Sequence, residues 1–274
     1  MELSWHPAPG KLNLFLHVLG RRADGYHELQ TVFRLIDRCD RVGISLRNDA
    51  EIRFSGMFGE DNLCVRAARL LQKETGSKLG ADLRLEKQLP VGGGLGGGSS
   101  DAGTVLLVLN RLWKLFLPRE KLMELALQLG ADVPVFVYGR NALGEGIGER
   151  LTALELPRAW YVVLAPQVSV STKETFQSAL TRPAKRLKIP PFFSGQGAND
   201  LEPLVTARYP EVAAQLAWLR KQRPQARMTG SGACVFAEFE KEADARATQS
   251  QVPGGMSGFV AQGLERHPLY DWAD

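Results

Sequence analysis

The sequence predicts an α+β fold made of two lobes. At 274 residues the chain exceeds the roughly 50 to 250 residues of a typical domain, so we expect more than one compact unit. Patterns typical of strands cluster ahead of patterns typical of helices, whereas strict alternation would indicate a doubly wound parallel sheet. We place the lobe boundary near residues 151–157, which gives a first lobe of residues 1–152 and a second of residues 153–274.

The first lobe opens with two stretches in which apolar residues alternate with others. Between these stretches, Asp24 and Gly25 form a hairpin-type turn signal. A period of two is typical of strands, and we expect the apolar members to share one face of each strand. These members are Leu12, Leu14, Leu16 and Val18, followed by Val42, Ile44 and Leu46.

Helix signals follow the paired strands. Asp61 and Asn62 can cap a helix that Gly76 ends, and Pro118 and Gly130 bound a second helix in the same way. Further expected elements are a strand at Leu83 and Leu85, an element after Asp132-Val133-Pro134, a buried strand at 160–165, a polar surface segment at 182–191, a helix at 210–219 and a strand at 235–239.

Composition indicates a folded, cytosolic protein. Hydrophobic residues at 44% and charged residues at 23% are ordinary for a globular chain. A net charge of +4 favours a mildly basic enzyme with anionic substrates over a nucleic-acid-binding protein, since no Lys/Arg-rich stripe is present. Cys39, Cys64 and Cys234 lack metal-ligand spacing, which is typical of reduced thiols. We find no signal peptide and no stretch that would insert into a membrane.

A glycine-rich loop lies between a predicted strand and a predicted helix. Six of the seven residues at 92–98 are glycine, so several backbone N–H groups can converge without obstruction from Cβ atoms. Ser99, Ser100 and Asp101 then begin the helix, whose N-terminus attracts anions. A flexible linker would not be flanked so closely by regular elements, so we favour a triphosphate site.

Two other nucleotide-binding patterns fit this loop poorly. Gly92, Gly94 and Gly97 match the dinucleotide fingerprint, but Glu120, the acidic residue at the required spacing, falls within a predicted helix. A P-loop would place a lysine after the last glycine, and here Ser99 follows Gly98 directly. The loop must therefore take its positive charge and its general base from other segments.

Two such segments flank the loop along the chain, and together the three resemble the signature motifs of the GHMP small-molecule kinases. The segments are PAPGKLNL at residues 7–14 and MTGSGAC at residues 228–234. Within this superfamily the chain is most similar to the 4-diphosphocytidyl-2-C-methyl-D-erythritol kinases. That closer similarity, which covers nearly the whole chain, is carried by GRRADGYH at 20–27, LGADVP at 129–134 and GAND at 197–200.

The resemblance implies an ATP-dependent kinase of non-mevalonate isoprenoid precursor biosynthesis. Its acceptor would be the 2-hydroxyl of 4-diphosphocytidyl-2-C-methyl-D-erythritol, a small cytidine diphosphate derivative. An ATP-binding lobe and a substrate lobe would face each other across a cleft that holds the active site. The resemblance further implies Mg²⁺ as a cofactor and a cytoplasmic monomer or homodimer. Residues 197–200 supply no glutamate for the metal, so its ligands are left unassigned.

The resemblance also assigns site residues. Lys11 and Asp132 would form the catalytic pair, with the carboxylate as general base and the ammonium stabilising negative charge. Without the resemblance, Lys11 would be interpreted as a surface lysine and Asp132 as a helix cap. ATP would contact Pro90, Val91, Gly92, Gly93, Gly94, Leu95, Gly96, Gly97, Gly98, Ser99 and Ser100, together with Asn62 and Lys87. Asn13 would contact the methylerythritol part of the substrate, and Tyr26, His27, Phe33 and Phe176 would line the cytidine pocket.

Three alternatives remain at this stage. A GHMP kinase acting on mevalonate, homoserine or a sugar would share the glycine-bearing motifs, and only the segments around Tyr26 and Asp132 would separate it. A basic nucleic-acid-binding module would show salt-dependent binding without ATP turnover. A nicotinamide dehydrogenase is disfavoured because the expected strand after the glycine loop is missing.

Overall fold

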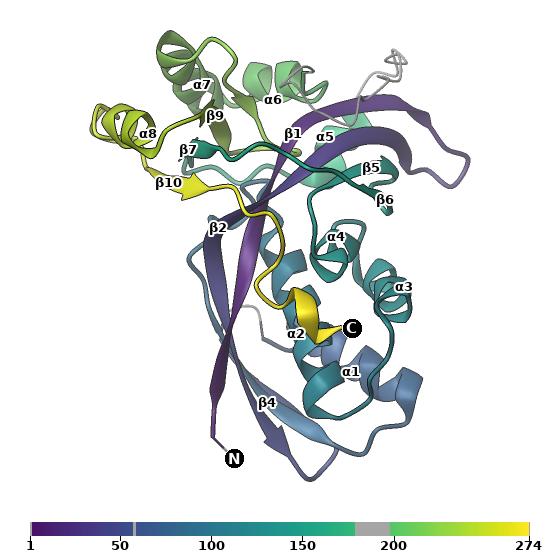
Figure 1. Ribbon diagram of the computed structural model, residues 1–274. Coiled ribbons are helices and arrows are strands. Elements are labelled where there is room, and N and C mark those ends of the chain that lie inside the picture. The colour runs from purple at the N-terminus through teal and green to yellow at the C-terminus, as the bar shows by residue number, and fades with distance from the viewer. Residues whose placement is uncertain (1, 57–58, 179–197, 274) are drawn as a thin grey trace.

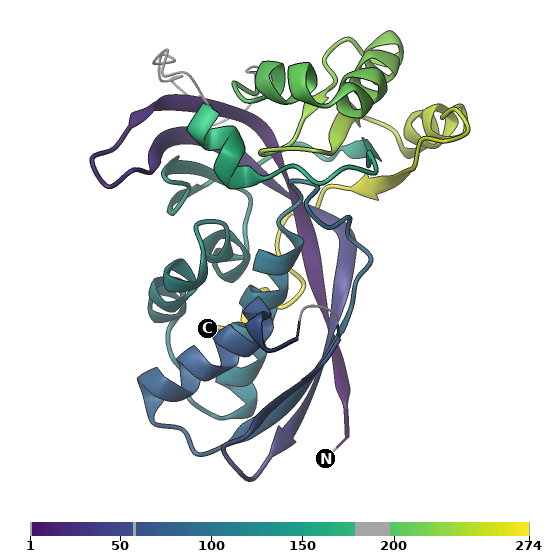
Figure 2. The same cartoon turned by 180° about the vertical axis from the view of Figure 1, so that it is seen from behind.

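The structure is a computed structural model that describes residues 2–56, 59–178 and 198–273. Two sheets, each with its own helices, form an upper and a lower lobe, and the long hairpin of β1 and β2 runs through both (Figure 1). Figure 2 shows the same arrangement from behind, with the lower helices on one side of the hairpin. The predicted α+β class is confirmed.

The first sheet contains the N-terminal hairpin at its centre. Its strand order is β3-β4-β2-β5-β6, and β1 pairs with β2 outside this path. All pairings are antiparallel except that of β3 with β4, and Gly25 turns the β1–β2 hairpin at φ 88°. The strands are β1 (Ser4–Arg21), β2 (His27–Arg47), β3 (Ile52–Ser55), β4 (Gly80–Glu86), β5 (Ala142–Gly146) and β6 (Arg150–Ala153).

The prediction that the alternating apolar residues of β1 share one face is wrong. A register shift between Asn13 and Leu16 interrupts the alternation, so that Leu12 packs into one apolar cluster and Leu16 into another. The intervening polar residues Lys11 and Asn13 are buried as well, because both faces of β1 are covered. The alternating pattern predicts one buried face, whereas residues on both faces of β1 are buried.

The helices of the first lobe lie on one side of the first sheet, some against the strands and one against the other helices. Asn62 caps the first helix, with its Oδ1 accepting a hydrogen bond of 2.8 Å from Cys64 N, and Gly76 ends it in the left-handed region. Pro118 and Gly130 flank the third helix as predicted. The helices are α1 (Leu63–Thr75), α2 (Gly97–Leu112), α3 (Arg119–Leu129) and α4 (Val133–Tyr138), with a short 3₁₀ turn, η1, at Gly59–Asp61.

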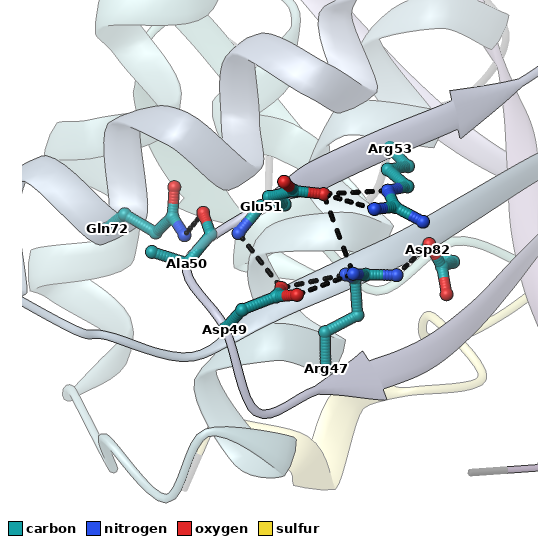
Figure 3. A network of polar contacts seen from close by, with 7 residues as sticks. All are labelled: Arg47, Asp49, Ala50, Glu51, Arg53, Gln72 and Asp82. Carbon is teal, nitrogen blue, oxygen red and sulfur yellow. Dashed lines mark hydrogen bonds and ion pairs between the residues drawn. The ribbon is translucent and has the colours of Figure 1, made fainter.

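A turn at the far end of the first sheet is held by charged side chains. Arg47 contacts Asp49, Glu51 and Asp82, and Arg53 contacts Glu51 (Figure 3). Exposed pairs of this kind each contribute about 0 to 1 kcal/mol. The network fixes the β2–β3 connection beside β4, the strand that leads into the glycine loop.

The second sheet is antiparallel, in the order β10-β7-β9-β8. The strands predicted at 160–165 and 235–239 and the helix predicted at 210–219 are confirmed, whereas the segment predicted at 182–191 lies outside the described residues. The strands are β7 (Trp160–Leu164), β8 (Arg227–Met228), β9 (Val235–Phe239) and β10 (Gly258–Gln262), and the helices are α5 (Thr172–Ser178), α6 (Glu202–Arg208), α7 (Pro210–Gln222) and α8 (Glu242–Gln249).

The C-terminal tail returns to the first lobe after β10 (Figure 1). Its 3₁₀ turn, η2 (Tyr270–Trp272), lies against α2, and Leu269 joins the apolar core of the first lobe. The division of the chain near residue 152 remains a prediction. None of the helices within residues 2–56, 59–178 and 198–273 has both the length and the apolar character needed to cross a bilayer.

Candidate active site

A cavity of 660 Å³ brings the three signature segments together. Its walls come from β1, the glycine loop, the start of α4, the start of α5 and the turn after β8. Residues predicted for the site that line it are Lys11, Asn13, Phe33, Asn62, Lys87, Pro90, Val91, Gly92, Gly93, Gly94, Leu95, Gly96, Gly97, Gly98, Ser99, Asp132 and Phe176. Tyr26, His27 and Ser100 are not among the residues that line this cavity.

The conformation of the glycine loop requires glycine at specific positions. Gly92, Gly94 and Gly96 have φ angles of 70°, 77° and 70°, which L side chains rarely adopt. A Cβ on Gly94 would also lie 2.3 Å from Thr229 O. Gly96 precedes α2 and has no side chain to cap it, so the first amide groups of the helix are left for an anionic ligand.

Backbone hydrogen bonds fasten the loop to both flanking segments. On one side, Lys11 N donates to Leu95 O at 2.9 Å. On the other, Cys234 N donates to Gly93 O at 3.0 Å and Ala233 N donates to Gly92 O at 3.2 Å. Three motifs far apart in the sequence therefore form one continuous wall of the cavity.

Lys11 is buried at the centre of this wall. Its side chain is 2% exposed, so the interpretation as a surface lysine is wrong. Lys11 Nζ donates to Asn13 Oδ1 at 2.6 Å and to Gly94 O at 3.0 Å, and it lies 3.3 Å from Asp132 Oδ2. The ammonium thus links the glycine loop to the carboxylate predicted as the base.

Asp132 occupies the N-cap position of α4 but makes no capping hydrogen bond with its side chain. The side chain is 39% exposed and borders the cavity, with Lys11 as its ion-pair partner. The geometry therefore does not support a purely structural capping role. A carboxylate placed between solvent and a buried ammonium can accept a proton from a bound alcohol.

Asn13 is held by Thr229, from the signature segment at 228–234, and by Thr31, which the sequence did not indicate. Asn13 Nδ2 donates to Thr31 Oγ1 at 2.8 Å, and Asn13 N donates to Thr229 Oγ1 at 2.9 Å. The side chain of Asn13 is 3% exposed, yet it borders the cavity. The side-chain oxygen of Asn13, Oδ1, faces Lys11.

Lys87, at one end of the cavity, is set between two buried carboxylates. Its Nζ forms ion pairs with Asp40 and with Asp101, the latter at 2.8 Å. Burial raises the pKa of Asp101 to about 7; Lys87 opposes this rise, and Asp40 adds to it. Asp40 also accepts hydrogen bonds from the backbone N–H groups of Gln88 and Leu89, which fixes the entry to the glycine loop.

Aromatic side chains also border the cavity. Phe33 is buried, with its ring centroid 5.7 Å from Lys11 Nζ, and Phe176 lies on α5. The His27 and Phe176 ring centroids are 5.5 Å apart. Burial is the larger cause that lowers the pKa of His27, and the positive charge of Arg21 lowers it further. His27 thus packs beside Phe176, and Phe33 borders the same cavity as Phe176, whereas Tyr26 is 57% exposed.

Asn199 and Asp200 tie other segments of the site together through hydrogen bonds to the backbone. Asn199 Nδ2 donates to Met228 O at 2.9 Å and to Gly230 O at 2.8 Å, which holds the second glycine turn in place. Asp200 Oδ2 accepts a hydrogen bond of 2.8 Å from Val18 N. In the described part of the chain, no group of three or more His, Cys, Asp or Glu side chains could hold a metal ion by itself.

Known proteins match this chain over most of its length. Family models for the N-terminal and C-terminal domains of the GHMP kinases match residues 62–140 and 192–257. The 4-diphosphocytidyl-2-C-methyl-D-erythritol kinases of Nitrosospira multiformis and Ralstonia nicotianae are 59% and 54% identical to it. Each alignment covers 98% of this chain, with 94% and 96% of the respective relative.

Solved structures agree with these matches. A crystal structure of a 4-(cytidine 5'-diphospho)-2C-methyl-D-erythritol kinase superposes with a TM-score of 0.83 at 34% identity, covering 95% of this chain and 99% of the other. A homoserine kinase from Cytophaga hutchinsonii shares the fold, with a TM-score of 0.73 at 15% identity over 97% of this chain and 96% of its own. The chain is thus a GHMP kinase and belongs to the family of 4-diphosphocytidyl-2-C-methyl-D-erythritol kinases.

Proposed function

We propose that this kinase transfers the γ-phosphoryl group of ATP to the 2-hydroxyl of 4-diphosphocytidyl-2-C-methyl-D-erythritol. The product would be the 2-phosphate, an intermediate of non-mevalonate isoprenoid precursor biosynthesis. The relatives' names support the choice of acceptor. The observation that carries the chemistry is Lys11 Nζ, which lies within 3.3 Å of both the glycine loop and the Asp132 carboxylate.

The geometry supports a role for each side of the transfer. The amides of the glycine loop and the start of α2 would hold the β- and γ-phosphates. Asp132 would take the proton of the acceptor hydroxyl while the hydroxyl oxygen forms the new bond to the γ-phosphorus. The bond from that phosphorus to the β,γ-bridging oxygen would break, and ADP would leave. Lys11 would offset the negative charge that gathers between the two substrates.

The lining of the cavity has a charged part and an aromatic part, which suggests how the substrates lie. Asn62 and Lys87 would contact ATP at the charged part. The cytidine would occupy the aromatic part, which holds Phe33 and Phe176, with His27 packed beside Phe176. Tyr26 follows the hairpin turn directly before His27, and we retain it as a residue that stacks on the base once substrate is bound.

Magnesium fits this site only as an ion held mainly by phosphate and water. Mg²⁺ usually keeps several waters and binds through one or two protein oxygens together with substrate phosphates. Ser99 borders the cavity, so its hydroxyl is a candidate ligand, and the hydroxyl of the buried Ser100 beside it has no hydrogen-bond partner among the described residues. When bound, the ion would neutralise phosphate charge and orient the γ-phosphoryl group.

Both substrates are phosphorylated metabolites, so we place the enzyme in the cytoplasm, where ATP is available. It would act there as a monomer or a homodimer.

The test is a substrate panel. ADP release by the purified chain with ATP and Mg²⁺ should depend on the cytidylated methylerythritol, while mevalonate and homoserine should give at most background turnover. Phosphorus NMR of the product should place the new phosphate on the 2-hydroxyl. Preferential turnover of mevalonate or homoserine would refute the proposed acceptor.

A further inference from the structure

We infer that Thr31, a residue outside the cavity, sets the orientation of the Asn13 amide and thereby the position of the Lys11 ammonium. Thr31 lies on β2 with no exposed surface. It therefore acts as a positioning residue, because it reaches the reacting atoms only through Asn13. The inference rests on the proposed function, in which Lys11 and Asn13 face the transferred phosphoryl group and its acceptor.

A bulge in β1 creates the binding position for the Thr31 hydroxyl. The pairing register shifts between Asn13 and Leu16, which leaves Phe15 outside the regular ladder of β1 and β2. Thr31 Oγ1 donates its hydrogen to Phe15 O. A hydroxyl carries a single proton, so toward Asn13 this oxygen can only accept.

This polarity determines which way the Asn13 amide points. Its Nδ2 donates to Thr31 Oγ1 at 2.8 Å, so its Oδ1 is directed to the opposite side, where it accepts from Lys11 Nζ at 2.6 Å. The hydrogen bond from Asn13 N to Thr229 Oγ1 fixes the backbone but leaves the amide plane free to turn. Thr31 thus holds the amide, from the side opposite the ammonium, in the one orientation that also suits Lys11, which can only donate.

The selected orientation completes the surroundings of Lys11. An ammonium has three hydrogens and no acceptor, and Lys11 Nζ has three oxygen neighbours: Asn13 Oδ1, Gly94 O and Asp132 Oδ2. A reversed amide would place an NH₂ group against the ammonium, so that two donors would face each other. Lys11 would then shift away from Asn13 and lose its alignment between the glycine loop and Asp132.

Thr31→Val tests this inference because valine keeps the shape of threonine and removes the hydroxyl. We expect kcat to fall about tenfold, the effect of roughly one lost hydrogen bond on the barrier. The KM for ATP should stay near the wild-type value, because in the proposed function Asn13 contacts the acceptor and the glycine loop is unchanged. Thr31→Ser, which restores the hydroxyl, should recover most of the lost turnover.

A matched control and a double-mutant cycle separate positioning from simple destabilisation. Thr104 is also fully buried and donates to a backbone carbonyl, Pro7 O at 3.3 Å, without any link to Asn13. Thr104→Val should lower the melting temperature but leave kcat unchanged.

In an Asn13→Ala background, Thr31→Val should have no further effect on kcat, because Thr31 acts on Lys11 only through the amide that this background lacks.

The outcomes distinguish this inference from the proposed function. Equal kcat values in wild type and Thr31→Val, or additive effects of Thr31→Val and Asn13→Ala on kcat, would overturn the role of Thr31 while leaving the kinase activity standing. If wild type fails to phosphorylate any acceptor of the panel, the proposed function fails. The coupling between Thr31 and Asn13 is then measured from the free energy of unfolding of wild type, Thr31→Val, Asn13→Ala and the double variant. Additive effects of the two changes on this free energy would equally overturn the role of Thr31.

Discussion

Replacing Asp132 by asparagine tests whether this carboxylate is the general base of the reaction. The change removes the proton acceptor and keeps the size of the side chain, and at 39% exposure the site tolerates an amide without burying an unpaired group. A positioned general base contributes about 10²- to 10⁴-fold, so kcat should fall within that range. At about 1.36 kcal/mol per decade, this is a barrier increase of roughly 3 to 5 kcal/mol.

The assay is coupled ADP release with each substrate varied in turn, together with the melting temperature. KM for ATP should stay near the wild-type value because the glycine loop is intact. Asp82→Asn is the matched control: Asp82 is 42% exposed and lies 3.2 Å from Arg47, so it resembles Asp132 in exposure and pairing but is remote from the cavity. Near-normal kcat in Asp132→Asn, or an equal loss in Asp82→Asn, would refute Asp132 as the base.

Three further changes test other parts of the site. Tyr26→Ala should raise KM for the cytidylated substrate far more than KM for ATP, and equal shifts in steady-state kinetics would exclude base stacking. Gly94→Ala places a Cβ 2.3 Å from Thr229 O at a φ of 77°, so it should cost at least about 1 to 2 kcal/mol of stability and most ATP affinity; calorimetric titration showing wild-type binding would contradict this. Asp101 has a pKa raised from 3.8 to about 7, so the native state holds a proton that the unfolded chain has lost. Stability should therefore fall as pH rises from about 4 to 7, and denaturant unfolding should show a flatter pH dependence for Asp101→Asn. An unchanged slope would argue against this titration.

Local signals in the sequence predicted local structure well. Asn62 and Gly76 bound α1, and Pro118 and Gly130 flank α3, because caps depend on residues within one turn of the helix. The glycine loop was likewise recognisable, since its conformation requires glycine at fixed positions.

Contacts between distant residues could not be predicted in the same way. Asp40 pairs with Lys87 across 47 positions, and Asn13 meets Thr31 across 18. No spacing rule connects such pairs; they follow from the register of the first sheet. The bulge in β1 was missed for the same reason, because the alternation of Leu12 and Leu16 does not reveal a change of partner cluster.

The hairpin of β1 and β2 has a mechanical consequence for the enzyme. These strands, 18 and 21 residues long, pass from one lobe into the other despite the bulge in β1, and Leu16 also hydrogen-bonds to Ala198 and Asp200 in the second lobe. A continuous antiparallel ribbon resists bending, so we expect the lobes to keep a nearly constant mutual angle during turnover. Substrates would then enter and leave a site that is already assembled, without large movements of one lobe relative to the other.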